Sequence, residues 1–447
     1  MKVSVIGTGY VGLVSGVCLA EKGHEVICVD QLASKVEQIN QGIPPIYEKG
    51  LSDLLSKNIH HNLSATTDLD AAIQNSQISL IAVGTPFNEE TQAIDLQYIK
   101  TVSQAIGESL RHKASYHLIV VKSTVVPGTT DDVVLPILEQ SSGKKAGHDF
   151  GVGMNPEFLR EGNAVEDFMF PDRIVLGGMD EKSTTGLFEL YQVFNDVDKI
   201  ATNNKTAEMI KYASNSLLAT LISFSNEVAN LCVATGGVDV TEVTKAIHLD
   251  KRISPILKTG ERITPHVTTY IEAGCGFGGS CFPKDVKALI AHGKQAESSM
   301  PLLEAVMKIN AQQPYQLINL LKKHFSVLAN LNVALLGLAF KPDTDDVRES
   351  PTLPIIQTLL ESQAQLKLFD PIFKQLPDVL KSTDITLCQS LEEVIENVDA
   401  ILLITRWPVF EQLPELLAKL PNPPLVVDGR RILSKNTISR YEGIGLG

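Results

Sequence analysis

Short apolar segments alternate with amphipathic segments over roughly the first 200 residues of the chain. The apolar segments suit buried strands, and the segments between them repeat apolar residues at helical spacing. Strands are expected at residues 3–6, 25–29, 80–83, 118–122, 151–154 and 173–176. Strands that alternate with helices build a parallel sheet with helices on both faces. The pattern therefore predicts an α/β, doubly wound domain over residues 1–200.

The middle of the chain has a different pattern. From about residue 203 to residue 234 it has the spacing of one long helix, which ends before Gly236 and Gly237. The apolar positions of this helix include Ala207, Ile210, Leu217, Leu218, Leu221 and Phe224. More helical pattern follows, so we expect a central helical region over residues 201–315. A long helix between two domains is a frequent dimer interface, and a homodimer or higher homo-oligomer is expected on that ground.

The α/β pattern returns in the last third of the chain. Strands are expected at residues 332–336, 365–369, 400–405 and 425–427, with helical segments between them. Pro351 and Pro354 stand near the start of the first of these helices, where proline is tolerated. A second, smaller doubly wound domain is predicted over residues 316–447.

Composition narrows the class of protein. A chain of 447 residues is too long for one core and suggests two or three domains. The formal net charge of −13 argues against nucleic acid or an anionic membrane as the main partner. No uninterrupted apolar stretch approaches the ~20 residues of a membrane span. The six cysteines are scattered, without disulfide or zinc-site spacing, so we expect a cytoplasmic protein without a bound metal.

A glycine motif follows the first predicted strand and opens a helix. Gly7 allows a tight turn, Gly9 lets a pyrophosphate approach the backbone, and Gly12 lets helix and strand pack closely. Asp30, at the end of the second strand, can accept hydrogen bonds from ribose hydroxyls. Its carboxylate would repel a 2′-phosphate, and no arginine follows it directly. The context favours a Rossmann-like NAD site over NADP, and over a glycine turn that binds nothing.

Cys281 carries the strongest signal for chemistry. It follows a glycine-rich loop and stands at the start of a helix that begins near Pro283, with Lys284 beside it. A helix N-terminus and a nearby cation lower the pKa of a thiol, which prepares a nucleophile. Asp285 could orient or deprotonate a neighbour. The cysteines in apolar patterns are interpreted as structural, and Cys275 is left unassigned; the structural set is Cys18, Cys28, Cys232 and Cys388.

Other polar residues stand near strand ends or share a helix face. Lys211 and Asn215 are four residues apart on the long helix and project together, as an oxyanion site or as a solvated face. Residues 155–162 follow a strand and carry two carboxylates that could act as a general base through water. Thr85 and Thr124 follow two other strands, as ligand contacts or helix caps.

Taken together, these motifs make the chain resemble the UDP-glucose/GDP-mannose dehydrogenase family over essentially its whole length. The motifs are residues 7–12 with Asp30, 84–86, 122–124, 155–162, 211–215, 276–285, 340–344, 348–350 and 428–431. The resemblance implies an NAD-binding domain, a central dimerisation region and a C-terminal domain that binds a UDP-sugar. It also implies two successive hydride transfers from C6 of the sugar, with Cys281 forming a thiohemiacetal and then a thioester that water cleaves.

The resemblance also implies roles for single residues. Lys211 and Asn215 would stabilise oxyanions with help from Asp285, and Thr124 and Glu157 would position or activate water. The implied cofactor contacts are Gly7, Gly9, Tyr10, Val11, Gly12, Asp30, Lys35, Thr85, Thr124, Glu161, Lys284 and Arg348. The implied substrate contacts are Glu157, Phe158, Leu159, Arg160, Glu161, Lys211, Asn215, Arg252, Tyr270, Ile271, Glu272, Ala273, Gly274, Gly278, Lys341 and Arg430.

Two segments depart from the family pattern. The chain carries extra residues between Arg252 and Gly276, so Arg262 competes with Arg252 for contact with a neighbouring subunit's site. Residues 91–95 lack the glycine that is usual there. UDP-glucose is the expected substrate, a choice favoured by Arg406, Trp407 and residues 155–162, and GDP-mannose and UDP-N-acetylhexosamines are the alternatives. A two-electron β-hydroxyacid dehydrogenase and a dinucleotide sensor without activity are the alternatives of other classes.

Overall fold

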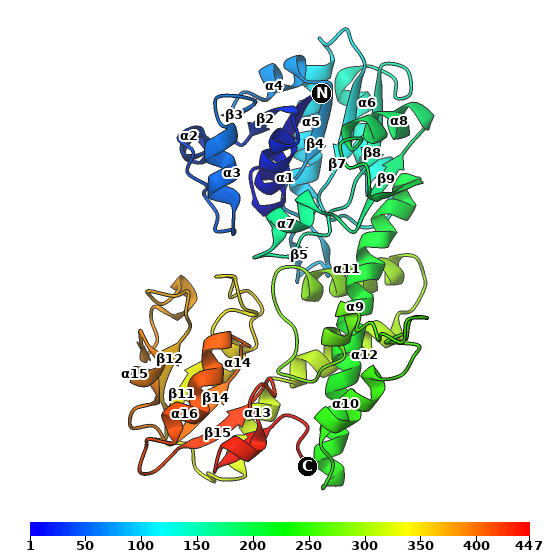
Figure 1. The fold of residues 1–447 in the computed structure, drawn as a ribbon. Coiled ribbons are helices and arrows are strands. Elements are labelled where there is room, and N and C mark those ends of the chain that lie inside the picture. Colours follow the sequence, from blue (N-terminus) through cyan, green and yellow to red (C-terminus); the bar gives the residue numbers. More distant parts are fainter. The chain divides into compact units, whose positions relative to one another are not determined.

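The computed structural model describes residues 1–447 and divides into two compact units, residues 1–214 and residues 215–447. Each unit contains one large sheet, and Figure 1 shows the first unit in blue to green and the second in green to red. The predicted α/β class, with two doubly wound sheets and a long helix in the middle of the chain, is confirmed.

The first unit is built around an eight-stranded sheet of order β10-β9-β8-β7-β4-β1-β2-β3. Its strands are β1 (Lys2–Ile6), β2 (Glu25–Val29), β3 (Leu63–Thr66), β4 (Ile78–Ile81), β7 (His117–Val121), β8 (Phe150–Met154), β9 (Arg173–Gly178) and β10 (Asp198–Thr202), and β5 (Phe87–Asn88) and β6 (Ala93–Ile94) form a separate hairpin. The central strands are buried on both faces, because Leu80 and Val120 join one apolar cluster while Ile81 and Val121 join another. Each such side chain contributes about 1.5–3 kcal/mol.

Helices cover this sheet. They are α1 (Tyr10–Glu21), α2 (Ala33–Asn40), α3 (Leu51–Asn58), α4 (Leu69–Asn75), α5 (Gln97–Leu110), the π-helical turn η1 (Thr129–Val134), α6 (Leu135–Ser142), α7 (Ala164–Met169) and α8 (Glu181–Leu190). Asp68 caps α4 and Asp180 caps α8, each accepting a backbone N–H of the first turn.

The expectation of a wholly parallel sheet is wrong at one strand pair. β9 runs antiparallel to β8, with Gly153 opposite Gly178 and Met154 opposite Gly177. The connection from β8 to β9 contains only the short helix α7, so the chain returns along β8 without crossing to the other end of the sheet. Residues 155–172 therefore stay at the carboxyl end of β8.

The long helix predicted for the centre of the chain is α9 (Asn204–Thr235), within one residue of its expected ends. Ala207, Tyr212, Ala219 and Ala229 are buried along it. By length and composition alone α9 would also suit a membrane span, which is weak evidence because a helix in the core of a soluble protein passes the same test.

The second unit holds the remaining helices and a six-stranded sheet. Its helices are α10 (Val240–His248), η2 (His266–Tyr270), α11 (Phe282–Gln295), α12 (Pro301–Gln312), α13 (Tyr315–Lys322), α14 (Thr352–Glu361), η3 (Asp378–Leu380), α15 (Leu391–Ile395), η4 (Pro408–Gln412), α16 (Leu413–Leu417) and η5 (Lys435–Thr437). Its strands are β11 (Asn332–Leu336), β12 (Gln365–Phe369), β13 (Ile385–Leu387), β14 (Ala400–Leu403), β15 (Leu425–Asp428) and β16 (Tyr441–Gly443), all parallel, in the order β13-β12-β11-β14-β15-β16.

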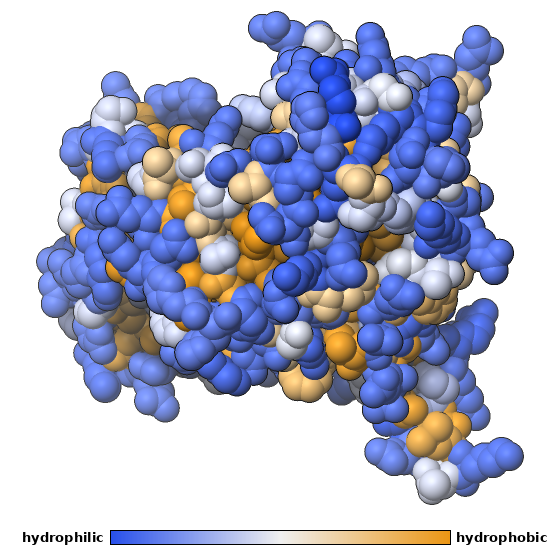
Figure 2. Space-filling model, turned by 90° about the horizontal axis from the view of Figure 1, so that it is seen from above, coloured by the Kyte–Doolittle hydropathy of each residue, from blue (hydrophilic) through white to orange (hydrophobic).

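Apart from the β5–β6 hairpin, the strands absent from the prediction are the edge strands of the two large sheets. β3, β10, β13 and β16 end or border the two sheets and have polar or partly exposed residues. An edge strand needs little apolar content, so its sequence lacks the signal of a buried strand. The face of the molecule in Figure 2 is mostly hydrophilic, with local apolar patches, as the composition indicates.

Candidate active site

The glycine motif forms a tight turn between β1 and α1. Gly7 has a φ of +96°, and a side chain there would press on the carbonyl oxygen of Ala82 at 2.7 Å. A side chain at Gly12 would overlap the carbonyl of Gly7 at 1.8 Å, whereas one at Gly9 would meet nothing within 4 Å. The turn is thus closed on its inner side and open at Gly9, at the N-terminus of α1. This is the opening through which a pyrophosphate can reach backbone N–H groups.

Asp30 directly follows β2 and is hydrogen-bonded to the glycine turn. Its Oδ2 accepts hydrogen bonds from the backbone and hydroxyl of Thr8, at 3.0 and 2.6 Å, and its Oδ1 accepts the Leu32 N–H at 3.0 Å. Burial raises the pKa of Asp30, but these hydrogen bonds and the charge of Lys35 outweigh it, and the pKa is lowered. The carboxylate is therefore ionised, half-buried and able to accept ribose hydroxyls. The glycine turn can accommodate the pyrophosphate of NAD, and the carboxylate can accept its ribose hydroxyls, so the two features together fit this cofactor.

Tyr10, at the start of α1, and Glu48 connect the glycine turn to the loop that follows β8. The hydroxyl of Tyr10 donates to Glu48, and this buried carboxylate also accepts the backbone N–H groups of Gly162 and Ala164, at 2.8 and 3.0 Å. Glu48 thereby caps the start of α7. The sequence interpretation missed Glu48, because a lone glutamate in a loop gives no signal of burial.

The two threonines predicted as ligand contacts meet at neighbouring strand ends. The hydroxyl of Thr85 donates to the carbonyl of Thr124 at 2.8 Å, and Ser123 donates to the carbonyl of Val83 at 2.6 Å. These bonds tie the segments after β4 and β7 into one rim. Val11 lies half-buried in the first turn of α1.

The loop after β8 carries a buried ion pair. Glu157 Oε1 lies 2.9 Å from Lys211 Nζ on α9, and both side chains are almost inaccessible to solvent. Burial raises the pKa of Glu157, but Lys211, the backbone N–H of Leu159 and the charge of Lys122 outweigh it, so the pKa is lowered. The structure therefore brings together two residues that were predicted for the site, as an ionised pair.

The remaining residues of this loop are held by ring and ion contacts. The ring of Phe158 lies close to two cations, Arg173 at 3.9 Å and Lys211 at 5.5 Å. Arg160 is bound to Asp167 of α7, with a shortest N–O distance of 2.6 Å. Arg160 is thus engaged within the loop, and Glu161 follows it at the turn before α7.

Cys281 stands at the N-cap position of α11, with Pro283 in the first turn, as predicted. It is the only one of the six cysteines that is not buried, and none is in a disulfide. Ser280 Oγ lies 3.6 Å from its Sγ. By contrast, burial raises the pKa of Cys18 and of Cys28 to about 12 and that of Cys275 to about 11. The accessible thiol is the one at a helix N-terminus.

A short polar chain lies beside Cys281 in the second unit. Asn215 Nδ2 donates to Asp285 Oδ2 at 2.7 Å, and Lys284 Nζ donates to Asp285 Oδ1 at 2.6 Å. The backbone N–H of Asp285 donates to the carbonyl of Cys281 at 2.8 Å. Asp285 is fully buried, so its two oxygens fix the amide of Asn215 and the ammonium of Lys284 on either side. The predicted partners Asn215, Lys284 and Asp285 are therefore one connected group.

The glycines before Cys281 are required by close packing. A side chain at Gly278 would overlap the carbonyl of Glu349 at 2.2 Å, and one at Gly279 would enter the ring of Phe340 at 2.7 Å. Gly279 also donates its N–H to the carbonyl of Arg348 at 2.9 Å. The cysteine loop is thus seated against residues 340–349.

Three buried or half-buried amides anchor this loop, and the sequence interpretation missed them. Asn310 of α12 accepts the N–H of Phe277 at 2.8 Å and donates to its carbonyl at 2.9 Å. Asn226 accepts the N–H of Gly274 and Gln313 donates to its carbonyl, at 2.8 and 2.9 Å. The signal in the sequence is an amide at an inward position of an amphipathic helix, which is visible only once the packing is known.

Arg430 braces the same loop from the end of β15. Its Nε donates to the carbonyl of Ile404 at 2.6 Å and its Nη1 to that of Gly276 at 3.3 Å. Arg406 binds Glu272 at 2.8 Å and donates to the carbonyl of Arg430 at 3.2 Å. The predicted contacts begin at Tyr270, the last residue of η2, and continue in the segment after it, with Ile271, Glu272, Ala273 and Gly274.

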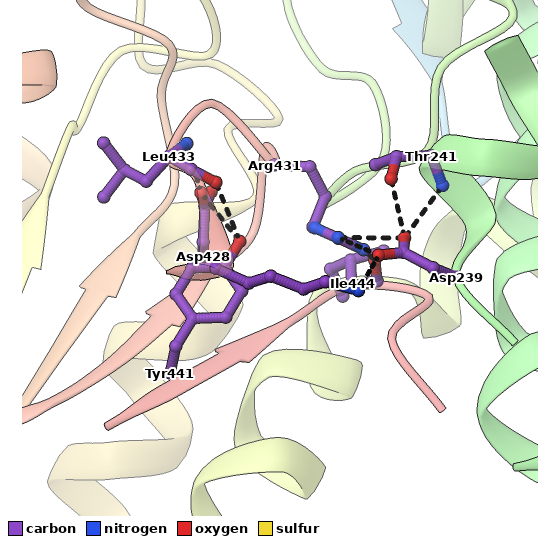
Figure 3. A network of polar contacts seen from close by, with 8 residues as sticks. Asp239, Thr241, Asp428, Arg431, Leu433, Tyr441 and Ile444 are labelled. Atoms are coloured by element: carbon purple, nitrogen blue, oxygen red, sulfur yellow. Dashed lines mark hydrogen bonds and ion pairs between the residues drawn. The ribbon is translucent and has the colours of Figure 1, made fainter. Parts of the chain in front are cut away.

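The next residue, Arg431, anchors the segment that follows β15 (Figure 3). Its guanidinium lies 2.9 Å from the carboxylate of Asp239, which also accepts the hydroxyl of Thr241 at 2.7 Å. Burial raises the pKa of Asp239, but hydrogen bonds from Arg431, Thr241 and Lys435 outweigh it and lower the pKa strongly. Arg431 has a φ of +52°, a strained conformation that its buried ion pair stabilises.

The second sheet repeats the glycine-and-aspartate arrangement of the first, with a difference. Gly337 follows β11 with a φ of +100°, and Asp370 ends β12. Asp370 is buried, and its Oδ2 accepts the N–H groups of Leu338, Ala339 and the Trp407 indole at 2.8, 3.2 and 3.2 Å. Unlike Asp30, it is saturated by protein donors and has no access to a ribose.

Three predicted contacts lie on the surface. The guanidinium of Arg252 is 89% exposed and is paired with Asp250 at 2.6 Å. Arg348 is paired with Asp346 at 2.8 Å, and Lys341 lies over the ring of Phe340 at 5.7 Å. Arg262, the rival of Arg252, donates to the carbonyls of Leu249 and Ser254 at 2.8 Å. Within one chain, Arg262 thus stabilises the extra segment, whereas Arg252 is directed to solvent.

Comparison with known proteins identifies the family. Three family models of the UDP-glucose/GDP-mannose dehydrogenases match the chain: the NAD binding domain at residues 1–195, the central domain at 205–312 and the UDP binding domain at 334–435. The chain is 39% identical to a UDP-glucose 6-dehydrogenase of Haloferax volcanii, over 99% of this chain and 100% of that protein. It is 38% identical to a GDP-mannose 6-dehydrogenase of Pseudomonas aeruginosa, over 99% and 100%.

A solved structure agrees with this. A UDP-glucose dehydrogenase from Pyrobaculum islandicum has a TM-score of 0.89 at 37% identity, covering 100% of this chain and 98% of that one. The family models match residues in all three parts of the chain. The chain belongs to the UDP-glucose/GDP-mannose dehydrogenase family and is an NAD-dependent nucleotide-sugar dehydrogenase.

Proposed function

We propose that this enzyme oxidises UDP-glucose to UDP-glucuronate in two NAD-dependent steps, through thiohemiacetal and thioester intermediates on Cys281. The single observation that carries the mechanism is the accessible thiol at the N-terminus of α11, beside the hydrogen-bonded group of Asp285, Lys284 and Asn215. An oxidation that stops at the aldehyde needs no such nucleophile. An oxidation to the acid needs one to convert the aldehyde to an acyl derivative.

The steps of the proposed oxidation use the thiolate of Cys281, bound NAD and water. NAD, when bound at the glycine turn, accepts the hydride that leaves C6 of the sugar. In the first step C6 loses a hydride and its hydroxyl loses a proton, which gives the aldehyde. The thiolate of Cys281 adds to the aldehyde carbon and gives the alkoxide of the thiohemiacetal, from which loss of a second hydride leaves the thioester. Water then adds to the acyl carbon, the C–S bond breaks, and the acid, the thiolate and a proton are released.

The buried pairs suit the charges that develop. Lys211 and Asn215 are proposed to stabilise the oxyanions, because an ammonium and an amide donor fixed by carboxylate partners need no reorganisation. Glu157 is proposed as the base that activates water, with Thr124 positioning it, since its lowered pKa keeps it ionised at neutral pH. Arg430 and Lys341 are proposed to contact the UDP-sugar.

UDP-glucose is preferred over GDP-mannose as the substrate. The likeness to the UDP-glucose dehydrogenase structure, with a TM-score of 0.89, exceeds that to a GDP-mannose dehydrogenase of Pseudomonas aeruginosa, with 0.55, at nearly equal identities of 37% and 38%. GDP-mannose is the second candidate, because relatives named for it match the whole chain at 38% identity.

The test is the yield of NADH per UDP-glucose consumed, for the parent and for Cys281→Ser. We expect two NADH per sugar from the parent and no free acid from the variant, because serine at this position is a far weaker nucleophile. The matched control is Cys275→Ser, a buried cysteine of the same loop, which should keep the yield of two. One NADH per sugar would contradict the four-electron oxidation. A parent that is active only on GDP-mannose would contradict the substrate.

We further propose that the enzyme is a cytoplasmic homodimer formed through α9. Leu217, Phe224 and Leu231 are seven residues apart on one face of this helix and are 59%, 50% and 66% exposed. Large apolar side chains repeated along an exposed helix face suit a second helix of the same kind. Burial against a partner would also explain the apolar composition of α9 without a membrane.

A further inference from the structure

Lys122 is a buried charge that the proposed mechanism does not use. It directly follows the apolar strand β7, and only 3% of its surface is exposed. A lysine is almost never fully buried unless its charge has a partner or a purpose. A buried lysine is therefore unusual at the end of this strand, whose last four residues are leucine, isoleucine and two valines.

The ammonium of Lys122 is held in a fixed place by neutral groups. Its Nζ donates to Asn155 Oδ1 at 2.8 Å and lies 3.5 Å from the hydroxyl of Tyr191. The same Oδ1 also accepts the Tyr191 hydroxyl, and Asn155 Nδ2 donates to the carbonyl of Val175 at 2.8 Å. The rings of Phe168 and Tyr191 lie 5.7 and 6.0 Å from Nζ. None of these groups neutralises the charge.

The only carboxylate that acts on Lys122 electrostatically is already paired. Glu157 raises the proton affinity of Lys122 and Lys211 lowers it, while burial, the largest effect, brings the pKa of Lys122 down to about 8. Glu157 itself forms its close ion pair with Lys211, at 2.9 Å. The carboxylate of Glu157 thus interacts with two buried ammonium groups, one in a close ion pair and one at longer range. Tyr191 remains neutral, because burial raises its pKa.

A buried ammonium that is held by neutral groups favours an anion near it. Arg173 of β9, which lies 3.9 Å from the ring of Phe158, is a further positive charge in this region. Lys211 is the member of the cluster that is proposed to meet the oxyanions of the reaction. Lys122, which interacts electrostatically with Lys211, makes the local potential more positive and strengthens that interaction without touching the substrate.

We propose that Lys122 is a positioning residue, whose buried charge acts through Glu157 and Lys211 to stabilise the oxyanions of sugar oxidation. The inference rests on the proposed function of Lys211 and deepens it. It predicts that Lys122 increases kcat/KM only while its side chain is protonated. Below its folded pKa the charge is present, and as the pH rises through about 8 the charge and its benefit are lost.

The test compares kcat/KM for UDP-glucose between the parent and Lys122→Met from about pH 6.5 to about pH 9.5, a range that spans the titration of a partly shifted lysine. Methionine keeps the length of the side chain and removes the charge. The ratio of parent to variant cancels every titration that both proteins share, including that of Cys281. We expect a ratio of about tenfold at the acidic end, equivalent to one unit of pKa, which falls towards one at the alkaline end. A merely structural role gives a ratio that does not change with pH.

The variant Lys122→Arg is a second test, and its outcome does not depend on whether the methionine variant folds. An arginine cannot lose its proton in this range, so it retains the charge. The ratio of parent to Lys122→Arg should therefore decrease as the pH rises through about 8, because only the parent loses the charge. A ratio that stays constant for both variants overturns the inference.

The matched control is Lys113→Met, at another buried lysine of the same unit. Lys113 donates to the carbonyls of Ile73, Gln74 and Ser76, at 2.7, 3.0 and 2.8 Å, and has no part in the site. Its variant should lose thermal stability but give a ratio that is constant with pH. A pH-dependent ratio for this control would overturn the interpretation of the Lys122 data. If the parent formed no NADH from any nucleotide sugar, the proposed function itself would be overturned. If the parent is active but the ratio of its kcat/KM to that of both Lys122 variants is constant with pH, only the role of Lys122 is overturned.

Discussion

At the scale of single residues, the two units use carboxylates in opposite ways. Asp30 holds the turn at Thr8 yet remains half-exposed, so that it can also bind a ligand. Asp370 holds the corresponding turn of the second unit and is fully buried against Trp407. The same residue type at the same position of a doubly wound sheet is therefore partly accessible to a ligand in one unit and fully enclosed by protein in the other.

Asp30→Asn is predicted to weaken the binding of NAD. An asparagine can still accept the Thr8 hydrogen bonds, but it forms weaker, neutral hydrogen bonds with the ribose. The KM for NAD should rise about tenfold, corresponding to about 1–1.5 kcal/mol, with kcat changed little. Discrimination against NADP should also decrease, since the negative charge is removed. Initial rates over a range of NAD and NADP concentrations measure both effects.

Asp68→Asn is the control for this variant. Asp68 caps α4 on the surface, where asparagine caps equally well, so its KM values should match those of the parent. An unchanged KM for NAD in Asp30→Asn would show that the carboxylate does not contact the cofactor.

At the scale of elements, the cysteine loop depends on its neighbours more than on its own sequence. The loop has little regular structure before α11, and its backbone is held by amides of α9 and α12 and by the carbonyl groups of residues 340–349. The position of Cys281 is thus determined by at least two packed helices. Substitutions in these helices should therefore change the position of the Cys281 thiol.

Asn310→Leu tests this dependence. Leucine has nearly the same size but loses both hydrogen bonds to Phe277, which should cost about 1–3 kcal/mol and loosen the loop. We expect kcat to fall about tenfold or more, because a misplacement of the order of 1 Å is costly. The melting temperature should fall by a few degrees. The rate at which iodoacetamide alkylates Cys281 should change as well.

The comparison variant is Asn319→Leu on the exposed face of α13, where the amide contacts only Gln316 at 3.4 Å. It should retain parental kcat and alkylation rate. If Asn310→Leu behaves in the same way, the anchor has no role in positioning the thiol.

At the scale of the whole molecule, the apolar stripe of α9 is the feature that one chain leaves unexplained. Phe224→Asp puts a charge in the middle of the stripe and should convert the proposed dimer to a monomer, because an unpaired charge in an apolar interface costs several kcal/mol. Light scattering coupled to size-exclusion chromatography gives the mass directly. Phe170→Asp, at a position 76% exposed in the first unit, should leave the mass unchanged. A parent that runs as a monomer at all concentrations would refute the proposal.

The buried parts of the fold were predictable from the sequence because burial leaves a periodic signal. β2, β11 and β12 have the expected bounds, and α9 differs by one residue at each end. The edge strands β3, β10, β13 and β16 were not predicted, since a strand with one neighbour can be polar. The three-domain division and the roles of the site residues remain predictions.

The sequence by itself determined the family, the cofactor turn and the place of Cys281 at a helix start, because glycine spacing, a carboxylate at a strand end and a proline in a first turn act locally. Only the tertiary structure decided which charges are buried together. Lys122, Glu157 and Lys211 come from a strand end, a loop and a helix, and Asn310 reaches Phe277 from another helix. Electrostatic interactions and hydrogen bonds depend on distance and burial, which the order of residues along the chain does not contain.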